Sequence, residues 1–352
     1  MQVASSFVVA LIAISALLVL LLFATAARKA LRAALDRRQA RVEAEVRPLL
    51  LSFLAADEPD PAALAVTSRA AGRSIEELAA GLLIKLRGED RRVLADLLAS
   101  QGVIERARAR TRRRGAVGRA RAAELLGAVG EPAAVPELER LLSDRDPDVR
   151  AAGARALGKL GGAEAVPALL ASLEGRRSVP AGIVTMALLH IGPAACEPLH
   201  EGLAEDYTTD VRAIAAELLG RLGALGASDD LARVLRADPS DAVRAAAARA
   251  LGRIGTPRSI PQVEAALVED ESVTVRQAAA WALGELGGAR GFAGLARALA
   301  SGHHALARSA ADALPTCGPS GLSLLERTVA EDRPGAAEAR ETLGRLAMGA
   351  AR

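Results

Sequence analysis

Aromatic residues are scarce in this chain of 352 residues, at 2% of the sequence. A core built around large rings is therefore excluded, and packing must come from many contacts among Ala, Leu and Val side chains. Four histidines and two cysteines, Cys196 and Cys317, are also few. Metal or acid–base catalysis would need an unusual arrangement of so few groups, and we predict no metal and no cofactor. The two cysteines are interpreted as reduced, buried thiols, because disulfides are rare in the cytoplasm.

Recognisable catalytic motifs are absent from the sequence as well. It contains no Gly-rich phosphate loop, no Ser-His-Asp or Cys-His signature and no metal-spaced cluster of Cys or His. We therefore predict that the chain is not an enzyme, and no small-molecule substrate is evident. The glycines are interpreted as residues that end helices.

What the sequence does contain is a repeat of about 31 residues. In VRAAGARALGKLG, which starts at Val149, apolar residues fall eight and eleven positions on, and each is followed by Gly. Clear copies start at Val149, Val211, Val243 and Val275, and weaker copies start at Gly118, Pro180, Leu306 and Gly335. A fixed period of this length predicts a solenoid, in which neighbouring units must stack to bury their apolar faces.

Each unit is predicted to be a pair of helices. An Asp-rich turn such as DRDPD at 144–148 supplies residues that can accept hydrogen bonds from a helix start. A second helix follows, with Pro in its first turn, where the missing N–H costs little. The second helices are expected to line the concave surface of the solenoid, at 133–143, 164–174, 194–205, 227–236, 258–269, 289–300 and 320–330.

The pattern D-x-x-VR-x-x-A-x-x-ALG-x-(L/I)-G, followed by a helix with VP-x-L, resembles the short HEAT-like repeats of bacteria, of the PBS-lyase type. The resemblance covers roughly residues 115–350 and implies an all-α, HEAT-like α-solenoid. That family includes adaptors, scaffolds and a few enzymes. Di-iron hydroxylases of this kind use several His-Glu pairs, whereas this chain has only His200-Glu201. Nothing supplies a bilin-lyase motif or the aromatic, basic surface of a HEAT-like DNA glycosylase.

An arginine follows the starting valine in the four clear copies, at Arg150, Arg212, Arg244 and Arg276. We interpret this structural repeat ladder as a set of bonds to the turn Asp of a neighbouring repeat, which is what the resemblance implies. The third repeat breaks the pattern, with Pro180 and Ala181 in place of Val and Arg. This break marks either a partner site or sequence drift.

An uncharged segment at 3–27 is long enough, at about 1.5 Å per residue, to span a hydrocarbon core of about 30 Å. We predict one N-terminal transmembrane helix. Cleavage at Ala24-Thr25-Ala26 is the alternative, and it would give an exported, envelope-facing solenoid. The membrane-surface residues follow the segment: Arg28, Lys29, Arg32, Arg37, Arg38 and Arg41. Positive residues stay in the cytoplasm, so we expect the N-terminus outside and the solenoid in the cytoplasm of a bacterial cell.

The predicted domains are an anchor at 1–27, a basic juxtamembrane stem at 28–56, an atypical helical cap at 57–114 and the solenoid of seven to eight repeats at 115–352. Residues 28–121 carry a net charge of +9 and residues 122–352 a net charge of −6. The basic part lies next to the membrane, where anionic lipid attracts Lys and Arg.

Eight of the sixteen residues at 106–121 are Arg, but no aromatics are interleaved. A solvated or lipid-facing basic helix is favoured there over a nucleic-acid partner. We therefore predict a membrane-tethered, single-pass scaffold or adaptor that binds a protein partner. The other alternative is a HEAT-like enzyme of the lyase or metal-dependent hydroxylase type.

Overall fold

The computed structural model describes residues 88–350, apart from the side chains of 288–290 and 350. It also describes residues 23, 29, 44–45, 47–54, 78–79, 81–83 and 86. The predicted membrane helix at 3–27 and its basic flank therefore lie outside the described residues, except for Phe23 and Lys29, which are both exposed. The backbone divides into two compact units, residues 1–106 and 107–352.

In the first unit, residues 47–54 are helical and α3 spans Glu89–Ser100. Leu50 and Phe53 of the first stretch are buried, as are Leu94 and Leu97 of α3. α4 (Val103–Arg110) then runs across the boundary between the units.

The second unit is a stack of helix pairs, and the described residues contain no strand. The helices that carry the repeat motif are called first helices here. They are α5 (Ala116–Val129), α7 (Pro147–Leu160), α9 (Ala181–Ile191), α11 (Thr209–Arg221), α13 (Asp241–Ile254), α15 (Val273–Leu286), α17 (His304–Ala313) and α19 (Ala336–Ala350). The weaker copies of the repeat thus form first helices too.

The second helices are α6 (Val135–Leu141), α8 (Val166–Ala171), α10 (Cys196–Glu201), α12 (Ser228–Ala237), α14 (Ile260–Glu269), α16 (Gly288–Leu299) and α18 (Pro319–Ala330). Short 3-10 turns precede most of them, at Pro132–Ala134, Ala163–Ala165, Gly192–Ala195, Leu225–Ala227, Pro257–Ser259 and Leu314–Cys317. The Gly that ends a first helix is left-handed, as at Gly161 (φ 78°) and Gly255 (φ 77°), which is the expected closing conformation.

The Gly nine positions into the motif lies inside the first helix and does not end it, so the sequence interpretation is wrong for this Gly. It packs against the next first helix. A Cβ added to Gly158 would lie 2.6 Å from Ala187 Cα, and one added to Gly252 would lie 2.7 Å from Ala282 Cα. The same close approach joins Gly127 to Ala156 and Gly220 to Ala250. The first helices therefore pack almost backbone to backbone.

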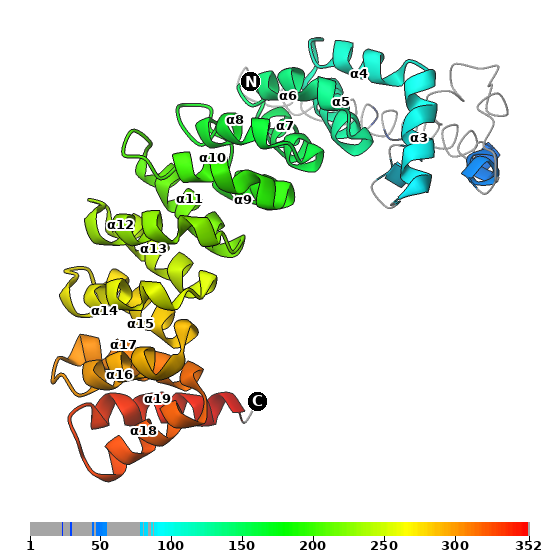
Figure 1. Ribbon diagram of the computed structural model, residues 1–352. Helices are drawn as coiled ribbons and strands as arrows, with labels where there is room; N and C mark the ends of the chain where they lie inside the picture. The colour runs from blue at the N-terminus through cyan, green and yellow to red at the C-terminus, as the bar shows by residue number, and fades with distance from the viewer. Residues whose placement is uncertain are drawn as a thin grey trace, which may run out of the picture. The chain divides into compact units, whose positions relative to one another are not determined.

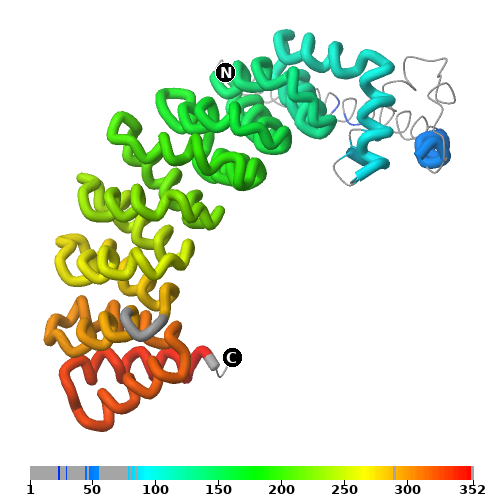
Figure 2. The backbone as a smooth tube through the Cα atoms, in the orientation of Figure 1, coloured from blue at the N-terminus to red at the C-terminus, as the bar shows by residue number. Residues whose placement is uncertain are grey.

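This packing decides which layer lines the inside of the curve of the second unit. In Figures 1 and 2 the first helices follow the inner side of the stack and the second helices its outer side. The expectation that second helices line the concave surface is therefore wrong. Small residues draw the first helices together, while the second helices, which lack such pairs, spread apart.

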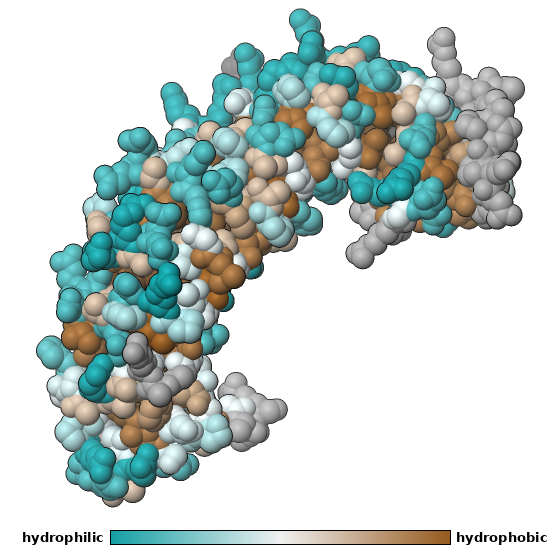
Figure 3. Space-filling view, in the orientation of Figure 1, coloured by the Kyte–Doolittle hydropathy of each residue, from teal (hydrophilic) through white to brown (hydrophobic). Residues whose placement is uncertain are grey.

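The core is aliphatic, as the scarcity of rings requires. Fully buried side chains include Leu157 and Val243 of first helices and Leu169 and Leu231 of second helices. Figure 3 shows hydrophobic residues between bands of hydrophilic side chains along the stack.

Candidate interaction surfaces

Among the described residues, successive helix pairs are connected by three ion pairs in which both side chains are buried or half-buried: Arg119–Asp144, Arg212–Asp238 and Arg244–Asp270. Arg244 donates from Nε and Nη2 to the two carboxylate oxygens of Asp270, at 2.8 and 3.0 Å. Its Nη1 donates to the carbonyl of Asp238 in its own turn, at 3.0 Å. Asp270 also accepts the N–H of Ser272 at 2.8 Å. One guanidinium thus fastens two consecutive turns.

The pKa values of these groups reflect the pairing. Burial raises the pKa of Asp270, but hydrogen bonds from Arg244 and the Ser272 N–H outweigh it and bring the pKa below its ordinary value. Asp144 has a lowered pKa for the same reasons, with Arg119 as the donor. The hydrogen bond to Asp270 raises the pKa of Arg244 against the effect of burial. The carboxyl groups of Asp144 and Asp270 are therefore charged at neutral pH.

Only two of the four predicted ladder arginines, Arg212 and Arg244, bond to the Asp of a neighbouring turn; Arg119, in a weak copy, was missed. Arg150 donates to the carbonyls of Asp144 and Arg145, in its own turn, at 3.0 and 3.3 Å. Arg276 likewise donates only to carbonyls of its own turn. The sequence contains a feature that could have identified Arg119 as a ladder residue, because Asp144 follows it by 25 residues.

The third repeat lacks the ladder Arg, and it also lacks the Gly through which other first helices pack closely. Leu189 of α9 stands where α5, α7, α11, α13 and α15 have the packing Gly. Leu218 of α11 stands where α7, α9, α13 and α15 have Ala. α9 and α11 consequently pack less closely than α11 and α13. The missing Arg at Ala181 and the bulky Leu pair weaken the same joint.

Each of the first helices α5, α7, α9, α11, α13 and α15, which follow the inner side of the stack, carries an exposed or half-buried side chain six residues after the start of the motif. This inner row consists of Glu124, Arg155, Met186, Glu217, Arg249 and Trp281. Charged residues predominate, and Arg155 pairs with Glu124 at 3.6 Å. Met186 is 53% exposed. Trp281 is half-buried, and the guanidinium of Arg253 lies 5.6 Å from the centre of its ring.

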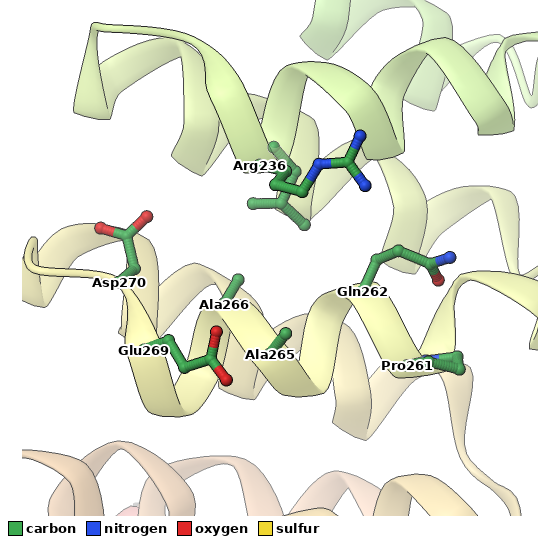
Figure 4. A pocket seen from close by; sticks show the side chains of 8 residues that line it. Arg236, Pro261, Gln262, Ala265, Ala266, Glu269 and Asp270 are labelled. Atoms are coloured by element: carbon green, nitrogen blue, oxygen red, sulfur yellow. The ribbon is translucent and has the colours of Figure 1, made fainter.

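The outer side opens into cavities between successive second helices. The space between α12 and α14 measures about 410 Å³. Ala265 and Ala266 of α14 face it, and Arg236, Gln262 and Glu269 surround it with polar atoms (Figure 4). A second cavity of about 280 Å³ lies between α14 and α16, and a third of about 730 Å³ lies between the turns that follow α6 and α8. These openings follow from the spreading of the second-helix layer.

Part of the Arg-rich segment is paired with acidic residues of the solenoid. Arg108 and Arg112 lie 3.2 and 3.5 Å from one carboxylate oxygen of Glu137, whose side chain is buried. Arg119 belongs to the ladder. These three arginines neutralise carboxylates of the solenoid, so the basic face available to lipid or nucleic acid is smaller than the sequence suggests.

The histidines and cysteines have separate structural surroundings, of which the described residues show the following. His304 pairs with Glu338 at 2.6 Å, and His190 is an exposed residue whose Nδ1 lies 2.9 Å from the Met186 carbonyl oxygen. In the part of the chain that the structure describes, no three His, Cys, Asp or Glu residues gather as metal ligands would. Cys196 and Cys317 are free, half-buried thiols, and burial raises the pKa of both.

The comparisons with known proteins agree with this geometry. A family model described as HEAT repeats matches residues 106–189, 196–272 and 228–315, which together make up more than half of the chain. The chain therefore belongs to the HEAT-repeat family. No curated protein matches it.

Among solved structures, a mutant of Kap121p matches with a TM-score of 0.53 at 12% identity, and the match covers 85% of this chain but 41% of that one. Human deoxyhypusine hydroxylase matches with a TM-score of 0.32 at 21% identity, over 79% of this chain and 97% of that one. The CpcE–CpcF complex of phycocyanin lyase from Nostoc sp. PCC7120 matches with a TM-score of 0.27 at 23% identity, over 71% of this chain and 92% of that one. At these identities the likeness concerns the fold alone.

One helical stretch of the described residues, Ala181–Glu201, is long and apolar enough to cross a membrane by composition. It comprises α9, the turn after it and α10, and its side chains Val184, Leu188 and Leu199 are buried in the stack. The stretch is therefore part of the helix stack, and 33% of its apolar window is buried.

Proposed function

We propose that this protein is a non-enzymatic scaffold, tethered to the membrane by residues 3–27, whose HEAT-repeat solenoid binds a protein partner. The observation that carries the proposal is the inner row. It presents one side chain from each of six successive first helices, α5 to α15, and Met186 is a large apolar group exposed among charged residues. A regularly spaced surface of this kind suits an extended protein segment.

The ladder supports this role by fixing the spacing of the row. Arg212–Asp238 and Arg244–Asp270 join turns of consecutive pairs through two parallel hydrogen bonds each. Such bidentate pairs define geometry as well as energy. A binding surface held at fixed intervals loses less conformational entropy when a partner binds.

For the tether we rely on the sequence. The uncharged segment is followed by Arg28, Lys29, Arg32, Arg37, Arg38 and Arg41, which favour a cytoplasmic solenoid and contact with anionic lipid. Protease added to intact cells should leave the solenoid undigested, while permeabilised cells should lose it. Digestion in intact cells would reverse the proposed orientation.

Partner binding is tested with a photo-crosslinking residue at Met186, on the inner row. The matched control places the same residue at Val268 of α14, which is 63% exposed on the outer layer. In native cells we expect one protein adduct at position 186 and none at 268. Equal adducts at both sites, or none at 186, would contradict binding through the inner surface.

A further inference from the structure

The joint between the pairs α7–α8 and α9–α10 contains an arginine prepared for a carboxylate that this chain does not supply there. Arg150 Nε is buried, and within the described part of the chain it has no hydrogen-bond partner. A buried polar group left unpaired is costly and calls for an explanation.

Arg150 is held in the same way as the arginines that do pair. Its Nη1 donates to the Asp144 carbonyl at 3.0 Å, just as Nη1 of Arg244 donates to the Asp238 carbonyl at 3.0 Å. In Arg119, Arg212 and Arg244, Nε donates to an Asp oxygen at 2.8 Å. The guanidinium of Arg150 is therefore fixed at one edge by its own turn, and the edge that binds Asp elsewhere is unused.

The sequence places a cation where the missing partner would stand. The ladder Asp follows its Arg by 25 residues at Asp144 and by 26 at Asp238 and Asp270. Residues 25 and 26 after Arg150 are Gly175 and Arg176, and Arg177 follows. Two cations thus stand at or next to the position that Asp occupies in the three joints with an Arg–Asp pair.

A cavity of about 730 Å³ lies at this joint. Ser143 and Ser172 line it together with Glu174, Arg176 and Arg177. Ser143 is adjacent to Asp144, whose carbonyl holds Arg150. Arg176 and Arg177 are exposed, and neither forms an ion pair among the described residues.

We propose that this joint, made of Arg150, Arg176, Arg177 and the cavity, binds an acidic side chain, Asp or Glu, of the protein partner. The proposal rests on the proposed function and names the chemistry of the partner at one place. Arg176 and Arg177 attract the carboxylate, and Arg150 receives it in the bidentate manner of Arg244. Because Nε is covered in the unbound protein, binding requires the turn at 172–179 to shift.

Two acidic residues of this joint, Asp144 and Glu174, do not accept a hydrogen bond from Nε of Arg150. Asp144 is already bound by both Nε and Nη2 of Arg119. Glu174 Oε1 accepts the N–H of Thr208 at 3.4 Å, in the following turn. A carboxylate on a single side chain is favoured over a bulkier anion because three other joints hold an Asp carboxylate against the Nε and Nη2 of their Arg.

The test uses the full-length protein and a fluorescent hexaglutamate peptide, with affinity measured by anisotropy. Arg176→Asp places a carboxylate 26 residues after Arg150, so it should raise the Tm by about 3 °C and weaken peptide binding at least tenfold. Arg177→Asp changes the same charge one residue away. It should weaken binding far less and leave the Tm unchanged.

A second variant tests the site even if the carboxylate introduced at position 176 does not contact Arg150. Arg150→Lys keeps the positive charge but cannot form two parallel bonds, and we expect it to weaken the peptide at least tenfold. With arginine labelled by nitrogen-15, the Nε–H signal of Arg150 should shift on peptide addition. Equal effects of Asp at 176 and 177, or an unmoved Arg150 signal, would overturn the proposal. Competition by inorganic phosphate at the peptide's own concentration would do the same, because it would favour phosphate as the ligand.

The two proposals can fail separately. A photo-crosslinker at Ser143 should capture the same partner as one at Met186, and Arg176→Asp should abolish only the adduct at 143. An adduct at 186 without one at 143 would remove the carboxylate site and leave the scaffold function standing. An adduct at 143 alone would remove binding through the inner row.

Discussion

Arg244 and Asp270 lie 26 residues apart in sequence and share two hydrogen bonds of 2.8 and 3.0 Å between consecutive turns of the solenoid. Both side chains are buried, with 10% and 8% of their surfaces exposed. Asp270→Asn leaves the guanidinium without its counter-charge. We expect a loss of about 3 kcal/mol in the free energy of unfolding, measured by urea denaturation.

The control for that change is Asp230→Asn, which breaks the exposed pair with Arg233. Exposed pairs contribute about 0–1 kcal/mol, so this variant should unfold close to the wild type. Equal losses in the two variants would contradict a structural role for the ladder.

The close contact of first helices predicts an unusual response to alanine. Gly220→Ala would put a Cβ 2.5 Å from Ala250 Cα, so α11 and α13 must separate. We expect destabilisation of about 1–3 kcal/mol by chemical denaturation, because overpacking strains the backbone. Gly118→Ala, in α5 with nothing within 4 Å of the added Cβ, should instead stabilise by about 0.5–1 kcal/mol. A stabilising alanine at 220 would show that the helices are not in contact there.

Acidification should weaken the solenoid through Asp144 and Asp270. Their folded-state pKa values lie below the ordinary 3.8, so the unfolded chain takes up protons first as the pH falls. Their contribution is complete above about pH 5 and is lost as the pH drops through the folded values. Urea denaturation between pH 7 and pH 3 should show this decline, and the decline should be shallower in Asp270→Asn. Parallel profiles for the two proteins would exclude Asp270 as a source.

The thiols should react slowly. Burial raises the pKa of both Cys196 and Cys317, and the thiolate is the reactive form. At pH 7.4, iodoacetamide should label the native protein more slowly than the urea-unfolded chain, as followed by mass spectrometry. Equal rates at either cysteine would show that its thiol is freely accessible.

The sequence by itself determined the repeat, and with it the helix pairs, because the period and the left-handed glycines such as Gly161 and Gly255 act within one unit. It also determined an aliphatic core, since almost no rings are available. The Val-Arg pattern was enough to mark Arg212 and Arg244 as candidates for bonds between turns. These features are local or are repeated at a fixed distance along the chain.

Only the tertiary structure decided which helix layer lies inside the curve. That choice depends on Gly158 meeting Ala187 and Gly252 meeting Ala282 across neighbouring pairs, and the spacing within one unit does not reveal such a contact. It also showed that Arg150, identical to Arg244 in its motif, has a buried Nε without an acceptor. Whether an arginine finds a carboxylate depends on the neighbouring unit packed against it. Two units with the same local sequence can therefore form different hydrogen bonds.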